Sequence, residues 1–129
     1  MRAVLVIALV AAIEGAAGVS VAGASAHVDP NPLLVTASQF LMIHAAAGVG
    51  LAALCAHEPP GRRWLAGIVF ALQAGVGLFA ADLCARAYLG AKLFPFAAPL
   101  GGGLTILSWL ALAVWSAVAL ARTGANGRS

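Results

Sequence analysis

Polar side chains are rare in this chain, and several of them fall near the middle of long apolar stretches. Glu14, His44 and Gln73 occupy such positions, and Thr105 and Ser108 lie near the middle of a fourth stretch. A charged residue at the centre of a bilayer costs about 2.5–3.5 kcal/mol on insertion scales, so Glu14 should face inward and be protonated or paired. We expect it to contact His44 through a charge-assisted hydrogen bond, with the other three residues extending a polar layer across the midplane.

Two interpretations of this midplane layer are open. Ionisable residues inside membrane segments often mark ion and proton pathways, so Glu14 and His44 would form a proton relay or a coupling-ion site. Alternatively, each stretch contributes one hydrogen-bonding group to a structural lock that holds the helices in register. Because the chain has no inverted repeat of the kind found in many transporters, we favour the lock.

Asp82 and Arg86 are four residues apart, which places them on one face of a helix near the outer end of the third apolar stretch. They predict an ion pair. Its role would be a gate, a site for a lipid headgroup, or an interfacial ion pair with no further function. Trp64, Tyr88 and Lys92 fit the usual anchoring of helix ends at a membrane interface.

Residues for a metal or cofactor site are not grouped in the sequence. A membrane haem needs paired histidines at a common depth, but His27, His44 and His57 fall at one edge, the centre and the other edge of the predicted spans. Clustered zinc ligands and a nucleophile beside a base are also missing, and the glycines at 101–103 lack the lysine and hydroxyl of a phosphate loop. We therefore expect no metal, no cofactor and no enzymatic activity; an enzyme acting on lipid at the membrane surface is the weakest of the functions considered.

The elements that carry these residues are apolar stretches of membrane-spanning length. Of 129 residues, 63% are hydrophobic and 9% are charged, whereas soluble domains have about 25% charged residues. A span needs about 20 apolar residues, and only helices and closed barrels satisfy the backbone inside a bilayer. The sequence predicts an all-α membrane protein, one domain over 1–129, with four transmembrane helices in an antiparallel bundle. The expected helices cover about 4–26, 33–56, 64–83 and 97–121, and a short polar cytoplasmic tail follows at 122–129.

Basic residues predict how the chain crosses the membrane. Five arginines fall on one side of the four spans and two basic residues on the other, which favours cytoplasmic termini. The five are Arg2, Arg62, Arg63, Arg122 and Arg128, and the two are Arg86 and Lys92. The net charge of +3 is thus an orientation signal, and we expect no nucleic-acid partner.

The first stretch also resembles a secretory signal, because small residues at 24–26 precede His27 as in a cleavage site. Glu14 in its apolar core and its length beyond the roughly 7–15 residues of a signal both favour a retained helix.

Small residues predict close helix packing, because lipid provides no hydrophobic drive between helices. Rows spaced by four residues comprise Ala8, Ala12, Ala16, Ser20 and Ala24 in the first span, and Gly67, Ala71 and Gly75 in the third. We interpret the chain as a structural or accessory component in the lipid bilayer that packs against a partner membrane protein or another copy of itself. The alternative is a small transporter that conducts protons or solutes through Glu14 and His44.

A motif in the last third of the chain is recognisable. Pro99-Leu100-Gly101-Gly102 is followed, after five residues, by Ser108-Trp109. This pattern resembles the domain-of-unknown-function family 423, the YgdD-like small four-helix membrane proteins of bacteria. The stretch from Ala81 to Gly90 resembles a branch common in alphaproteobacterial sequences. Earlier family features are similar at Ala26-His27 and at Phe40 and His44, with Leu41 where the family has a glutamine.

The resemblance implies a retained first helix and a multi-pass protein of the bacterial inner membrane, and it implies no activity because the family's role is not established. Pro99 suits the first turn of a helix. Gly101 and Gly102 would let another backbone approach the fourth helix closely. Trp109 lies deep in its span, where its indole N–H needs an acceptor, either Glu14 or a backbone carbonyl.

Overall fold

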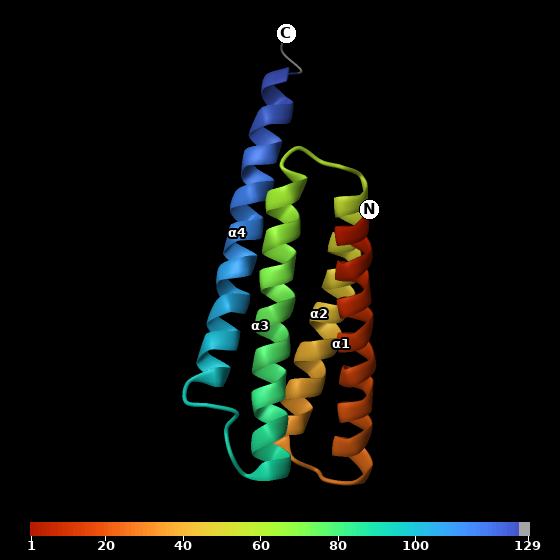
Figure 1. The fold of residues 1–129 in the computed structure, drawn as a ribbon, viewed down its shortest axis with the longest axis vertical. Coiled ribbons are helices and arrows are strands. Elements are labelled where there is room, and N and C mark those ends of the chain that lie inside the picture. Colours follow the sequence, from red (N-terminus) through yellow and green to blue (C-terminus); the bar gives the residue numbers. More distant parts are fainter. Residues whose placement is uncertain (127–129) are drawn as a thin grey trace.

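The computed structural model describes residues 1–126, with side chains up to residue 124, as four antiparallel helices (Figure 1). They are α1 (Arg2–His27), α2 (Pro32–Ala56), α3 (Arg62–Leu89) and α4 (Ala97–Asn126). Each is long and apolar enough to cross a membrane. The predicted all-α class and four-helix bundle are confirmed, and the four apolar helices indicate a multi-pass membrane protein.

Two helices extend beyond the spans expected from hydropathy. The third span was expected to end near residue 83, but α3 continues to Leu89 and ends where Gly90 adopts a left-handed φ of 67°. Arg86, in this extension, pairs with Asp82 one turn earlier. Of the tail expected at 122–129, residues 122–126 continue α4, and 127–129 lie outside the described residues.

Local sequence sets where the helices begin. The side-chain oxygen of Asn31 accepts a hydrogen bond from the backbone N–H of Leu33 at 2.9 Å, and Pro32 takes the first position of α2. Pro99 lies in the first turn of α4, where the backbone N–H that proline lacks would have no helical partner. Gly61 precedes α3 with a left-handed φ of 77°.

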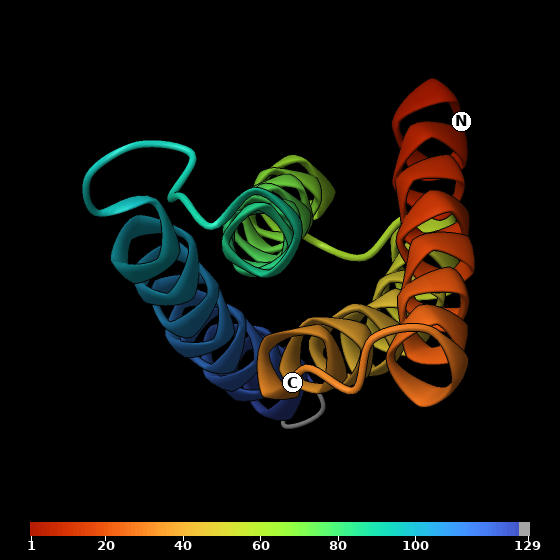
Figure 2. The same cartoon turned by 90° about the horizontal axis from the view of Figure 1, so that it is seen from below.

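Helix α3 lies at the centre of the fold and packs against each of the other three helices (Figure 2). Helices α1, α2 and α3 pack together in pairs. Within the described residues, the backbone of α4 approaches only that of α3. The bundle is therefore open, with α1 and α4 on opposite sides of it, rather than a closed square of four helices.

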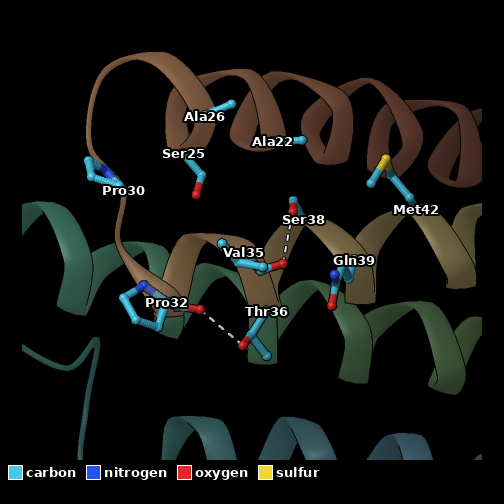
Figure 3. Close-up of a pocket in the computed structure, with 10 residues that line it drawn as sticks. All are labelled: Ala22, Ser25, Ala26, Pro30, Pro32, Val35, Thr36, Ser38, Gln39 and Met42. Atoms are coloured by element: carbon cyan, nitrogen blue, oxygen red, sulfur yellow. Dashed lines mark hydrogen bonds between the residues drawn. The ribbon is translucent and has the colours of Figure 1, made fainter.

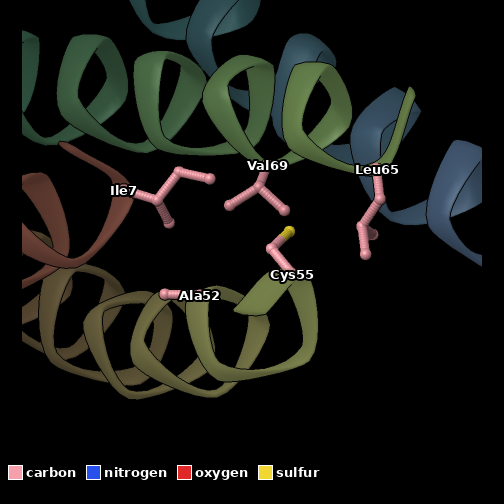
Figure 4. Packing of buried hydrophobic residues seen from close by; sticks show 5 residues of the cluster. All are labelled: Ile7, Ala52, Cys55, Leu65 and Val69. Carbon is pink, nitrogen blue, oxygen red and sulfur yellow. The ribbon is translucent and has the colours of Figure 1, made fainter. Parts of the chain in front are cut away.

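Two apolar clusters hold the helices together. Ile7, Ala52, Cys55, Leu65 and Val69 join α1, α2 and α3 near the end that carries the N-terminus, and Figure 4 shows their side chains converging. The side chains of α4 that pack against this cluster are Leu112 and Trp115. The second cluster, nearer the other end, comprises Ala37, Leu41, Val76, Ala80 and Leu83.

Small residues bring α1 and α2 close together. A Cβ atom at Gly18 would lie 2.7 Å from Met42 Cγ, and one at Gly48 would lie 2.9 Å from Ala11 Cβ. These contacts are too short for any larger side chain unless a neighbour moves. The small-residue row predicted for α1 does not take part in this contact. Its central members, Ala12, Ala16 and Ser20, are exposed on the outer face of α1.

Candidate functional site

The predicted midplane residues are all buried inside the bundle. Glu14 of α1 is 6% exposed, His44 of α2 is 8% exposed and Gln73 of α3 is 3% exposed, and Thr105 and Ser108 of α4 are buried as well. Glu14 lies on the inner face of α1, one turn from Gly18, where α2 approaches α1 closely. Ser25, Ser38 and Asp82 are buried as well, although the sequence did not single them out as buried positions.

The expected hydrogen bond between Glu14 and His44 is not formed. His44 Nδ1 donates to the carbonyl of Phe40 one turn earlier at 2.7 Å, and His44 Nε2 accepts from the indole N–H of Trp109 at 3.3 Å. Both ring nitrogens of a neutral imidazole are thereby used. Both carboxyl oxygens of Glu14 are buried without a hydrogen-bond partner. The prediction failed because a backbone carbonyl on the same helix and an indole on α4 supply the imidazole's partners.

The remaining midplane groups do not join one network. Gln73 Nε2 donates to the carbonyl of Ile7 at 3.0 Å, and Gln73 Oε1 has no partner. The hydroxyls of Thr105 and Ser108 donate to carbonyls one turn earlier in α4, at 2.9 Å and 2.8 Å. Such back-bonding satisfies a hydroxyl inside its own helix. The expected single polar layer is therefore absent among these residues. Instead, Gln73 of α3 bonds to Ile7 of α1, and Trp109 of α4 bonds to His44 of α2.

Trp109 has a different partner from either of those predicted. Its indole donates to His44 rather than to Glu14 or to a backbone carbonyl. Phe40 packs against the same imidazole, with ring centroids 4.4 Å apart, and against Phe79 of α3 at 4.6 Å. Phe40 and Trp109, both at positions of the family motif, therefore both contact the His44 ring. His27, by contrast, is exposed at the end of α1.

Asp82 and Arg86 form the expected ion pair, with Arg86 Nε 2.7 Å from Asp82 Oδ2. Asp82 is fully buried, at 0% exposure, and its second oxygen accepts a hydrogen bond from the backbone N–H of Leu93 at 2.9 Å. The sequence did not indicate this bond because Leu93 lies eleven residues away in a loop. The carboxylate thus ties the end of α3 to the segment that leads into α4.

Glycines of the motif take two different environments. A Cβ atom at Gly101 would lie 2.5 Å from the backbone nitrogen of Phe79, so the close approach expected there occurs. A Cβ atom at Gly102 would meet only the ring of Phe79, at 3.7 Å and beyond. Gly102 is therefore within van der Waals reach of one aromatic ring and is not packed against a backbone. Close contact is made by Gly75 instead, where a Cβ would lie 2.8 Å from the carbonyl oxygen of Gly101.

Clefts occur at the surface of the bundle, away from Glu14, His44 and Gln73. One of about 670 Å³ lies between α1 and α2 near the end that carries their connection (Figure 3). Its hydroxyls on Thr36 and Ser38 donate to carbonyls of their own helix, as Figure 3 shows, and its lining carries no charged side chain. A second, of about 810 Å³, lies between α3 and α4 beside the family motif. Across the described residues, no three potential ligands among His, Cys, Asp and Glu gather to hold a metal ion.

Comparison with known proteins identifies the chain only at the level of a family. Neither the curated proteins nor the solved structures include a match to it. A family model described as a protein of unknown function (DUF423) matches residues 14–102, which is more than half of the chain and includes α2, α3 and the start of α4. The resemblance to this family is confirmed, whereas the branch stays a prediction, and the chain belongs to the DUF423 family.

Proposed function

We propose that this protein is a small, non-enzymatic accessory component of the membrane, which packs against a helix of a partner membrane protein. The observation that carries the proposal is the outer face of α1. Ala12, Ala16, Ser20 and Gly23 are exposed there, on the side of the helix opposite to Ile7 and Glu14.

This face suits a second helix for a physical reason. Helices in lipid associate through close backbone approach and van der Waals contact, which small side chains allow. Open space surrounds Gly23, since nothing lies within 4 Å of a Cβ placed there. The hydroxyl of Ser20 donates to the carbonyl of Ala16 at 2.8 Å and so needs no partner of its own. The face can therefore lie against lipid or against a protein helix without an unsatisfied polar group.

Photo-crosslinking in native membranes tests the proposal. A photoreactive residue at Ala16 should give one discrete adduct, whereas the same residue at Ala113, exposed on α4, should not. Ala12→Leu in the Ala16 probe protein should abolish the adduct by blocking close approach, and Ala117→Leu on α4 should leave it intact. Crosslinking to lipid alone at both positions would overturn the proposal, and an adduct at twice the chain's own mass would identify the partner as a second copy.

A second candidate function, proton conduction, is favoured by one specific observation. Glu14 and Gln73 together place three unpartnered oxygen atoms in the interior of the bundle. Buried polar groups without partners are rare in proteins and call for an explanation such as an ion, a proton or a water molecule. Against a continuous pathway, five clefts within residues 1–122 are lined by residues other than Glu14, His44 and Gln73.

A proton-leak measurement in liposomes decides between the two functions. If Glu14 carries protons, Glu14→Gln and His44→Ala should both reduce the leak to that of empty vesicles, and Glu58→Gln, which alters an exposed acid outside the bundle, should not. If the accessory function is correct, the parent and all three variants should leak at the rate of empty vesicles.

A further inference from the structure

The cleft between α3 and α4 has the size and lining of a ligand site. Its volume of about 810 Å³ falls within the roughly 300–1,000 Å³ of small-molecule sites. Its lining residues come from α3, from the following loop and from α4, and Figure 1 shows this loop at the end of the bundle away from both termini. Its lining is mostly apolar and includes Phe79, Leu83, Phe96 and Ile106.

Helix packing creates this cleft. Gly75 and Gly101 bring α3 and α4 together so closely that neither position has room for a side chain. On the adjoining face, Gly102 and Gly103 leave space open, because only the ring of Phe79 lies within 4 Å of a Cβ at Gly102 and nothing does at Gly103. Gly75 and Gly101 thus allow close contact between α3 and α4, whereas Gly102 and Gly103 leave space beside that contact.

Two cations line the end of the cleft nearest the loop between α3 and α4, which we call its mouth. Arg86, in the last turn of α3, and Lys92, in the following loop, both line it. Asp82 is close to Arg86, but its oxygens are already bonded to Arg86 and to the backbone N–H of Leu93. Two positive charges against one negative charge leave the mouth with an excess of one positive charge, and Lys92 is exposed.

We propose that this cleft binds an anionic phospholipid, with its phosphate group between Arg86 and Lys92 and one acyl chain along Phe79 and Ile106. The charge of the mouth complements a phosphate, and the apolar lining complements an acyl chain. Basic pockets between transmembrane helices bind lipid headgroups by this chemistry. Because α3 and α4 are both candidate membrane spans, the open side of the cleft faces lipid. The cleft of Figure 3 lacks charged lining residues and so lacks the headgroup half of such a site.

Native mass spectrometry of the purified full-length chain tests the proposal. The protein is mixed with equal amounts of phosphatidylglycerol and phosphatidylcholine that carry the same acyl chains, and the bound lipid is counted. Phosphatidylglycerol should be retained preferentially. Lys92→Gln should lower its retention about fivefold, the equivalent of the roughly 1 kcal/mol that a cation near a membrane surface contributes. Arg122→Gln, which removes an exposed cation from the far end of α4, should leave retention unchanged.

Filling the hollow provides an independent arm of the experiment. Gly103→Leu places a side chain in the cleft without a backbone clash and should abolish preferential retention, whereas Gly67→Leu, at an equally open helical position outside this cleft, should not. Equal retention of the two lipids by the parent would overturn the proposal. So would equal losses in Gly103→Leu and Gly67→Leu, or full retention in Lys92→Gln. A shift in binding caused by inorganic phosphate alone, without lipid, would assign the cations to a free anion instead.

Discussion

Two acids are buried in this bundle, and their surroundings differ. Asp82 uses both oxygens, in bonds to Arg86 and to the backbone N–H of Leu93. Glu14 uses neither. A buried charge that loses its partner is costly, whereas an exposed ion pair contributes little to stability. At the scale of single residues, Asp82 therefore holds structure together, and Glu14 is the group whose role is still to be measured.

Replacing Asp82 should destabilise the fold. In Asp82→Ala, Arg86 and the backbone N–H of Leu93 both lose a buried partner, and the loop that leads into α4 loses its tie to α3. We expect a clear fall in the melting temperature of the detergent-solubilised protein. The matched control is Glu58→Ala, which removes the exposed ion pair between Glu58 and Arg62 and should leave the melting temperature unchanged. Equal effects in the two variants would contradict the structural role of Asp82.

Pairs of helices are joined by two kinds of contact. Glycines let α3 and α4 touch backbone to backbone at Gly75 and Gly101, whereas α4 reaches α2 only through side chains, as in the Trp109–His44 hydrogen bond. Lipid-embedded helices depend on such close contacts because the hydrophobic effect does not drive them together. The close packing of α4 against α3 thus depends on a few small residues.

Two alanine substitutions in the same helix should have opposite effects. Gly101→Ala places a Cβ 2.5 Å from the backbone nitrogen of Phe79, so α4 must move, at a cost of about 1–3 kcal/mol. Gly103→Ala meets nothing within 4 Å and should stabilise the protein by up to about 1 kcal/mol through higher helix propensity. Denaturant unfolding in mixed micelles measures both changes. A neutral Gly101→Ala would show that α4 does not pack on α3 as described.

The whole molecule is an open antiparallel bundle in which successive connections alternate between its two ends. The N-terminus and the connection between α2 and α3 lie at one end, together with the end of α4 (Figure 1). Arg2, Arg62, Arg63 and Arg122 are at this end, and Arg86 and Lys92 are at the other. The excess of arginine at the first end supports the proposal that this end faces the cytoplasm.

Cysteine labelling tests both the topology and the orientation. With Cys55 and Cys84 replaced by alanine, single cysteines at Val28 and Ala91 should react with an impermeant maleimide added outside intact cells. Cysteines at Ala56 and Gly124 should react only after the membrane is opened. All four positions are exposed at helix ends or in connections. The reverse pattern would overturn the orientation, and outside labelling at one position from each pair would contradict the four-span topology.

The sequence by itself determined the fold class, because 9% charged residues and four long apolar stretches are compatible with little else than membrane helices. It also predicted an inward-facing Glu14, because a charge at the bilayer centre is costly, but it did not indicate that Ser25, Ser38 and Asp82 are buried. The Asp82–Arg86 pair was predictable because a separation of four residues brings two side chains together in any helix.

Only the tertiary structure decided what the buried groups contact. Whether His44 faces Glu14 or Trp109 depends on how α2 is rotated against its neighbours, and hydropathy is similar all around a helix surrounded by lipid. The open arrangement, the outward turn of the small-residue row on α1, and the cleft beside Gly102 and Gly103 depend on helix packing in the same way. Spacing along a chain determines neighbours within one helix, and contacts between helices are determined by the shapes that several helices present together.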